Sequence, residues 1–207
     1  MPFLKSNLPN FFSIIRIISI PYIALLALNE EYKCYIVCAL LFLLSSLTDY
    51  LDGYLARKMG VVSKLGANLD LVADKLLVIS CLIILCILFR DPFIYIPTFI
   101  IFFREMYITW IRIISEWNPQ LKIIRVNFSG KLKTALQMIA IFILFVSLHP
   151  STYSFSIEVL GKILLWIALA QTIISLTHYL LDRSRWYKNM FLKLVISIYN
   201  LRAKSIK

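Results

Sequence analysis

The sequence predicts an all-α integral membrane protein with six transmembrane helices, an N-terminal interfacial helix and a basic amphipathic C-terminal tail. Three observations indicate this fold class. Hydrophobic residues make up 60% of the 207 residues and charged residues only 16%, whereas soluble domains are about 45–50% apolar and about 25% charged. The apolar residues form continuous runs, which is typical of helices rather than of transmembrane strands. Lysines and arginines are concentrated in alternate connections between these runs.

Six apolar runs are long enough to cross a hydrocarbon core, which needs about 20 helical residues. Their approximate bounds are residues 11–29, 35–56, 69–89, 92–113, 132–149 and 157–181. The chain is therefore divided into an N-terminal interfacial segment (1–10), a six-helix transmembrane domain (11–181) and a basic cytoplasmic tail (182–207). The first run has no leader cleavage signal and is interrupted by Arg16, so we expect it to be retained.

The two flanking segments have compositions suited to a membrane surface. Residues 2–10 have mixed polarity, as expected of a short helix that lies along the interface. Residues 186–207 combine apolar side chains with lysines and arginines, which predicts a basic amphipathic helix on anionic lipid. A disordered tail is the alternative for this second segment.

The charge distribution gives the predicted orientation. The chain carries 22 lysines and arginines against 11 aspartates and glutamates, a net charge of +11. Such an excess is also found in nucleic-acid-binding proteins, but in a membrane protein it marks cytoplasmic connections and contact with anionic lipid. The basic connections all fall on the side of the two termini, so we expect both termini in the cytoplasm and no nucleic-acid partner.

Four aspartates lie where the second and third apolar runs meet their connecting loop: Asp49, Asp52, Asp70 and Asp74. The spacings of three and four residues put each pair on one helix face, and the short loop makes the two helices antiparallel neighbours. Four converging carboxylates repel one another and need compensation. Oxygen ligands at this density suit hard divalent cations such as Mg²⁺ or Mn²⁺. The alternative is that each aspartate is solvated at the interface and paired with a local lysine or arginine.

The residues around these aspartates form a longer motif. The run from Asp49 to Arg57, with Gly66 to Asp74 after it, resembles the CDP-alcohol phosphatidyltransferase signature D-x2-D-G-x2-A-R-x8-G-x3-D-x3-D at every fixed position. The resemblance implies six transmembrane helices, usually in a homodimer, with the active site on the cytoplasmic side of a bacterial inner membrane. It also implies two divalent cations, Mg²⁺ or Mn²⁺, held by Asp49, Asp52, Asp70 and Asp74. Asp74 would also be the general base.

The same resemblance implies which residues bind CDP-diacylglycerol: Asn10, Ser13, Asp49, Gly53, Arg57 and Ser63. Several of them have an ordinary alternative role. Gly53 also allows two transmembrane helices to pack closely, and Arg57 also suits the cytoplasmic interface. The two serines and the asparagine also serve as helix caps.

Cations in the second half of the chain are candidates for binding the second substrate. Arg104 lies within the fourth apolar run, and Arg112 is offset from it by roughly 80° on an ideal helix, so both can face one cavity. Arg112 is also nearly in line with Glu105 and can pair with it. The alternative for Arg112, Lys131 and Lys133 is that they only mark the cytoplasmic side.

Two stretches around these cations carry a further resemblance. Residues 104–112 and 130–138, and the opening residues 7–16, are similar to the family members that use sn-glycerol 3-phosphate. This implies an acceptor-phosphate site of Arg104, Arg112 and Lys131, with Lys133 as a further candidate. A guanidinium matches phosphate oxygens well, which gives such cations a physical purpose.

The resemblance therefore implies an enzyme of phospholipid synthesis that joins CDP-diacylglycerol to glycerol 3-phosphate, giving phosphatidylglycerol phosphate and CMP. Inositol phosphate, serine or phosphatidylglycerol are alternative acceptors within the family. A divalent-ion transporter is an alternative of another class, but the sequence has neither internal repeats nor broken helices at the membrane centre. The expected partners are the two substrates, anionic lipid and a second copy of the chain.

Overall fold

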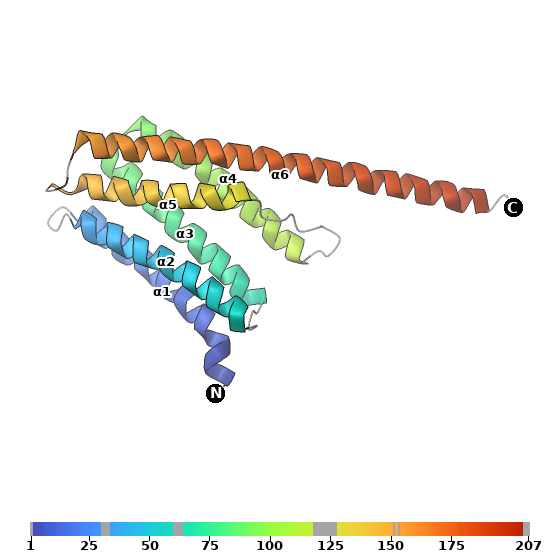
Figure 1. The fold of residues 1–207 in the computed structure, drawn as a ribbon, viewed down its shortest axis with the longest axis horizontal. Helices are drawn as coiled ribbons and strands as arrows, with labels where there is room; N and C mark the ends of the chain where they lie inside the picture. Colours follow the sequence, from blue (N-terminus) through green and yellow to red (C-terminus); the bar gives the residue numbers. More distant parts are fainter. Residues whose placement is uncertain are drawn as a thin grey trace.

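The computed structural model describes the backbone of residues 2–29, 34–59, 64–117, 128–150, 152 and 154–204. Side chains are described for residues 14–29, 34–48, 71–111, 113–114, 132–150, 152, 154–177 and 180–181. All regular structure in these residues is helical, so the predicted all-helical class is confirmed. The helices are α1 (Pro2–Leu28), α2 (Tyr35–Met59), α3 (Lys64–Phe89), α4 (Pro92–Trp117), α5 (Phe128–Leu148) and α6 (Phe155–Lys204) (Figure 1).

Three of the helices contain segments that are long and apolar enough to cross a membrane: Leu71–Phe89, Pro92–Ile111 and Phe155–Thr177. The described parts of the other helices contain shorter apolar segments: Ile14–Leu28, Tyr35–Thr48 and Leu132–Leu148. Large apolar side chains also face outward, with Leu25 71% exposed and Trp110 67% exposed. An exterior of this kind suits lipid rather than water, which identifies an integral membrane protein. The number of six spans stays a prediction.

The two flanking segments continue the helices beside them. Residues 2–10 form the first part of α1, and residues 182–204 form the last part of α6, which is 50 residues long. In Figure 1 the end of α6 extends in line beyond the other helices. The predicted divisions at residues 10 and 182 therefore do not coincide with helix ends. The position of either segment at a membrane surface stays a prediction.

α3 lies inside the bundle and contacts α1, α2, α4 and α5. Its described residues include Leu77 and Leu85, which are fully buried, and they belong to one core with Phe42 of α2 and Phe145 of α5. α5 packs along α6 on one side and against α2 on the other. Because α3 is central, the residues of its first turns reach the neighbouring helices α4 and α5.

α5 and α6 approach each other closely at Gly161. A Cβ atom built on this buried glycine would lie 2.8 Å from Cγ and Cδ2 of Leu144. No side chain larger than hydrogen fits there unless Leu144 moves. Small residues allow transmembrane helices this close contact, so Gly161 helps to set the spacing of α5 and α6.

The turn between α3 and α4 is tight and specifically capped. Arg90 has a φ of 52°, the left-handed conformation that commonly ends a helix. Asp91 then caps α4, because its Oδ1 accepts a hydrogen bond from the backbone N–H of Phe93 at 2.9 Å. Pro92 occupies the first helical position, where its missing N–H is not needed. This turn brings α4 back beside α3.

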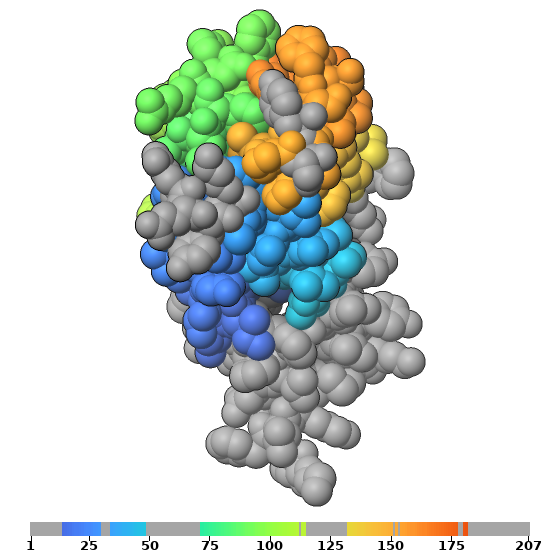
Figure 2. Space-filling model, turned by 90° about the vertical axis from the view of Figure 1, so that its left-hand side faces the viewer, coloured from blue at the N-terminus to red at the C-terminus, as the bar shows by residue number. Residues whose placement is uncertain are grey.

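A lysine of α6 connects this turn to the start of α6. Lys162 Nζ lies 2.5 Å from Asp91 Oδ2 and 2.5 Å from Glu158 Oε1. We call Asp91, Glu158 and Lys162 the Lys162 triad. Figure 2 looks at this end of the molecule, where residues of α3 and α4 (green) lie beside the first residues of α6 (orange). Trp166 Nε1 adds a 3.0 Å hydrogen bond to the backbone carbonyl of Phe93.

Candidate active site

Five ionisable side chains from three helices meet in the interior of the bundle. We call them the Glu105 cluster. They come from the beginning of α3, the middle of α4 and the beginning of α5: Asp74, Lys75, Arg104, Glu105 and Lys133. Charged groups within apolar segments are expensive unless they are paired, and they mark functional sites by default. The cluster is therefore the first candidate for the active site.

Glu105 is the centre of this cluster and is only 3% exposed. Its Oε1 accepts a hydrogen bond from Arg104 Nη1 at 2.9 Å and another from Lys133 Nζ. Its Oε2 lies 3.3 Å from Lys75 Nζ. One buried carboxylate thus contacts three cations on three different helices.

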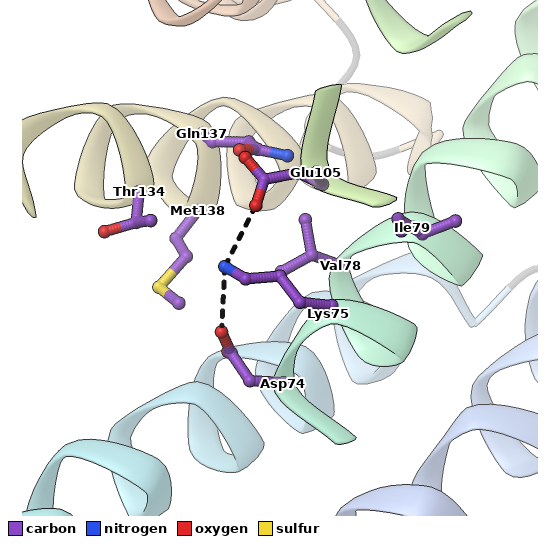
Figure 3. A pocket seen from close by; sticks show the side chains of 8 residues that line it. All are labelled: Asp74, Lys75, Val78, Ile79, Glu105, Thr134, Gln137 and Met138. Atoms are coloured by element: carbon purple, nitrogen blue, oxygen red, sulfur yellow. Dashed lines mark ion pairs between the residues drawn. The ribbon is translucent and has the colours of Figure 1, made fainter. Parts of the chain in front are cut away.

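Lys75 connects Glu105 to Asp74. Its Nζ lies 3.3 Å from Asp74 Oδ2, the same distance as from Glu105 Oε2. Figure 3 shows the Lys75 side chain between the two carboxylates. The two carboxylates therefore share one ammonium group, which offsets their mutual repulsion.

Arg104 is held from two sides. Besides its bond to Glu105, its Nη2 donates a hydrogen bond to Ser175 Oγ of α6 at 3.0 Å. Its Nε has no hydrogen-bond partner among the described residues. A buried N–H group without a partner is costly, so this donor is suited to an additional acceptor such as a ligand oxygen.

A small cavity lined by both polar and apolar side chains adjoins the cluster. Its volume is about 10 Å³, close to the minimum that one water molecule needs. Gln137 lines it and is 3% exposed, and its Nε2 has no partner in the part of the chain that the structure describes. The lining side chains, shown in Figure 3, are Asp74, Lys75, Val78, Ile79, Glu105, Thr134, Gln137 and Met138.

The charges of the Glu105 cluster do not balance. Its three cations outnumber its two carboxylates by one. Interactions between charges are strong where water is excluded, so the described part of the site favours a further anion. An acceptor that carries a phosphate is such an anion.

The structure brings three of the predicted site residues together. Asp74, Arg104 and Lys133 are all members of the Glu105 cluster. The side chains of the other predicted residues lie outside the described ones: Asn10, Ser13, Asp49, Asp52, Gly53, Arg57, Ser63, Asp70, Arg112 and Lys131.

The backbone nevertheless bears on the four aspartates. Asp49 and Asp52 belong to α2, whereas Asp70 and Asp74 belong to α3, and the end of α2 lies beside the start of α3 (Figure 1). In the described side chains, no three of His, Cys, Asp and Glu cluster as metal ligands. Only Asp74 of the four is among those side chains, so the metal site stays a prediction.

The sequence does not predict the contacts of two members of the cluster. Lys75 is not among the predicted site residues, and the predicted partner of Glu105 is Arg112. The described partners of Glu105 are instead Lys75, Arg104 and Lys133. The sequence does contain an indication of this cluster, because all its members are charged residues within or at the ends of apolar runs.

Comparison with known proteins identifies the class to which this site belongs. The chain matches the CDP-alcohol phosphatidyltransferase family over residues 6–174. It therefore belongs to that family, and it is an integral membrane enzyme of the CDP-diacylglycerol-dependent phosphatidyltransferase type.

Individual relatives are similar over nearly the whole chain. The protein from Rickettsia prowazekii is 39% identical over 173 residues, which cover 83% of this chain and 92% of the relative. The Haemophilus influenzae protein is 36% identical over 180 residues, covering 86% and 93%. The Pectobacterium atrosepticum protein is 31% identical over 180 residues, covering 86% and 94%. Each of these relatives is named CDP-diacylglycerol–glycerol-3-phosphate 3-phosphatidyltransferase.

Proposed function

We propose that this chain joins CDP-diacylglycerol to sn-glycerol 3-phosphate and releases phosphatidylglycerol phosphate and CMP. The relatives named above support this choice, since all carry the name of that reaction. The observation that carries it is the excess of buried cations in the Glu105 cluster, beside Asp74 of the family signature. A divalent-ion transporter is set aside, because the chain belongs to an enzyme family.

The donor side of the reaction is assigned to the aspartate signature. Asp49, Asp52, Asp70 and Asp74 would hold two divalent cations, with Asp49 and Asp70 serving both, Asp52 one of them and Asp74 the other. The set contains only carboxylate oxygens, which suit Mg²⁺ or Mn²⁺. When bound, the two cations neutralise the pyrophosphate oxygens of the donor. The proposed contacts to CDP-diacylglycerol are Asn10, Ser13, Asp49, Gly53, Arg57 and Ser63.

Asp74 is the proposed base that takes the proton from the acceptor hydroxyl. Its place supports this role, because Lys75 connects it to the residues proposed for the acceptor. The hydroxyl oxygen, once deprotonated, attacks the phosphorus of the diacylglycerol-linked phosphate. The bond from that phosphorus to the CMP oxygen breaks, and CMP leaves.

The acceptor phosphate is assigned to Arg104, Arg112 and Lys131, with Lys133 as a fourth contact. Arg104 is pre-oriented by Glu105 and Ser175, and its Nε remains available among the described contacts. A fixed guanidinium loses little freedom when it binds a phosphate. Lys133 shares the Glu105 carboxylate with Arg104, which supports its inclusion in the site.

The setting of this site in the membrane is also part of the proposal. We propose six membrane spans, with both termini and the active site on the cytoplasmic side of a bacterial inner membrane. The distribution of lysines and arginines supports this orientation. We also propose a homodimer and a contact between the basic tail and anionic lipid.

A turnover assay with a panel of acceptors tests the reaction. Purified protein is supplied with CDP-diacylglycerol and, separately, labelled glycerol 3-phosphate, glycerol, serine, inositol phosphate and phosphatidylglycerol. We expect efficient incorporation of glycerol 3-phosphate alone, because a buried cation site rejects analogues that lack the anion. Efficient use of inositol phosphate, with glycerol 3-phosphate a poor competitor, would reject the proposed acceptor while leaving the family unchanged.

A further inference from the structure

We propose that Lys75 and Glu105 form a positioning bridge, which fixes Asp74 relative to the acceptor cations Arg104 and Lys133. Neither residue belongs to the aspartate signature or to the assigned substrate contacts. The inference rests on the proposed function, since it assumes that Asp74 is the base and that the two cations hold the acceptor phosphate. In this proposal Lys75 and Glu105 touch neither substrate. They act by positioning Asp74, Arg104 and Lys133, which do.

The two oxygens of Glu105 divide the bridge into two halves. Oε1 receives both acceptor cations, Arg104 from the same helix and Lys133 from α5. Oε2 faces Lys75 of α3, and the same ammonium contacts Asp74. Among the described side chains, Asp74 forms no ion pair with either acceptor cation. Asp74 instead contacts Lys75 (Figure 3), whereas Arg104 and Lys133 contact Glu105. The path from base to phosphate site runs through two side chains.

Burial is strongest in the Glu105 half of this path. The Glu105 side chain is 4% exposed, Lys133 4% and Arg104 8%, whereas Lys75 and Asp74 in the other half are 18% and 17% exposed. Ion pairs that exclude water interact strongly and lose a great deal when one partner is removed. Packed side chains around the pairs restrict the available rotamers further. A change in the position of Arg104 or Lys133 is therefore transmitted to Lys75 and to Asp74.

The Lys162 triad is a second group of ion pairs between helices, and it differs from the Glu105 cluster in position and charge. Its Asp91 lies at the N-terminal end of α4, roughly 21 Å from Glu105 in the middle of that helix at a rise of about 1.5 Å per residue. Its side chains are 15–22% exposed, and its two carboxylates outnumber its one cation. It connects helices but offers no cation to a ligand. The Glu105 cluster has the opposite balance, which suits it to an anionic substrate.

The two bridge residues should have separable effects. Lys75 contacts Asp74 but neither acceptor cation, so its loss disturbs the base and leaves the phosphate contacts charged and paired with Glu105. Glu105 contacts both acceptor cations, so its loss disturbs phosphate binding as well as the base. If the two residues only stabilised the fold, their replacement would not lower kcat in one variant and raise the KM for the acceptor in the other.

The test measures kcat and both KM values for purified full-length protein in mixed micelles. For Lys75→Met we expect kcat to fall about tenfold or more, with each KM changed by less than about threefold. Lys75→Arg keeps the positive charge and should recover part of that kcat. For Glu105→Gln we expect a rise of about fivefold or more in the KM for glycerol 3-phosphate, a lower kcat and an unchanged KM for CDP-diacylglycerol.

The double variant Lys75→Met/Glu105→Gln measures coupling between the two residues. Because both act through one bridge, its loss of kcat should be smaller than the product of the two single losses. Glu158→Gln is the matched control, since it makes the same change in a lysine-paired carboxylate of the Lys162 triad. It should leave kcat and both KM values unchanged. Thermal unfolding of every variant verifies that the proteins compared are folded.

A kcat of Lys75→Met within about twofold of wild type, or fully multiplicative losses in the double variant, would overturn the bridge. If either neutral variant fails to fold, Lys75→Arg and Glu105→Asp decide, because both keep the charge and change only its position. Unchanged kcat in both would also overturn it. Wild-type protein that does not use glycerol 3-phosphate contradicts the proposed function instead, and the same variants then test the bridge with the acceptor that wild type does use.

Discussion

The Nη2 of Arg104 donates a hydrogen bond to the Oγ of Ser175 at 3.0 Å and so connects α4 to α6. The two residues are 71 positions apart in the chain. This contact adds a fourth helix to the surroundings of the Glu105 cluster. Because Nη1 donates to Glu105 and Nη2 to Ser175, both terminal nitrogens of the guanidinium are engaged, which restricts its orientation.

Replacement of Ser175 by alanine should therefore weaken acceptor binding. A hydrogen bond to a charged group contributes about 1.5–3 kcal/mol, which is equivalent to about 12- to 150-fold. Because Ser175 acts on the acceptor only through Arg104, we expect a smaller rise in the KM for glycerol 3-phosphate, of about three- to tenfold. The KM for CDP-diacylglycerol should not change. Thr177→Ala is the control, because among the described residues that hydroxyl donates to the carbonyl of Ile174 in its own helix. Equal KM values in the two variants would show that Ser175 does not orient Arg104.

Removal of divalent cations should abolish turnover. The proposed ligands are carboxylates, which do not hold two cations when the charge of a bridging member is lost. Asp49→Asn and Asp70→Asn should therefore lose nearly all activity even with excess Mg²⁺ or Mn²⁺. Activity is measured with chelator, after re-addition of each metal, and in both variants. A folded variant that kept more than a few per cent of activity would contradict the two-metal assignment.

Protonation of Asp91 should weaken the Lys162 triad at low pH. Hydrogen bonds from Lys162 and from the backbone N–H of Phe93 hold the pKa of Asp91 below its ordinary value of 3.8. A carboxylate with a lowered pKa stabilises the fold above its unfolded-state pKa, and this contribution is lost as the pH falls through the folded-state pKa. The contribution is therefore complete above about pH 5 and decreases below about pH 4.

Asp91→Asn isolates this contribution, since asparagine caps α4 as well as aspartate does but cannot pair with Lys162. Thermal unfolding in detergent between pH 7 and pH 3 should show wild type more stable at neutral pH and the difference shrinking in acid. Activity at pH 7 should be retained, because the triad lies far from the Glu105 cluster. A difference that grew as the pH fell would contradict the assignment.

Gly161→Ala should destabilise the contact of α5 with α6. The new methyl group would lie 2.8 Å from Cγ and Cδ2 of Leu144, so Leu144 or the helix must move. Overpacking of this kind costs about 1–3 kcal/mol, partly offset by the better helix propensity of alanine. Thermal unfolding measures the loss. With Leu144 also replaced by alanine, the added methyl group should cost much less, and equal losses in both backgrounds would rule out the clash.

The orientation of the chain can be measured independently of activity. Both termini are predicted on the cytoplasmic side, and the connection between α5 and α6 on the other. Reporter fusions at residue 207 and at Pro150 should therefore give opposite signals. A reporter at residue 207 that is active outside would mean that the number of spans is not six.

Much of the fold was predictable, because a continuous apolar run indicates a membrane-spanning helix whatever helices it packs against. The third run, residues 69–89, falls within α3, and the fourth, residues 92–113, within α4. The tight turn at Asp91 separates them as the sequence indicated. The helix ends were less predictable, since residues 182–204 change in polarity without any residue that breaks a helix.

The site was only partly predictable for a different physical reason. Asp74 and Arg104 stand out because one belongs to a spaced signature and the other is a cation in an apolar run. The contacts of Glu105 depend on how α3, α4 and α5 are rotated about their axes, which the sequence does not specify. Lys75 and Lys133 lie 30 and 28 positions from Glu105, so no local spacing rule relates them.

The unbroken course of α6 limits where the basic end of the chain can be. A helix of 50 residues measures about 75 Å, more than twice the roughly 30 Å thickness of a hydrocarbon core. If the helix crosses the bilayer and stays straight, its last turns stand about 40 Å beyond the apolar segment that ends at Thr177. The field of the lipid headgroups decays over about 8 Å at physiological salt. A straight α6 would thus place its terminal lysines beyond the reach of the lipid headgroups. The proposed contact between the basic tail and anionic lipid therefore requires a bend of α6 near the membrane surface.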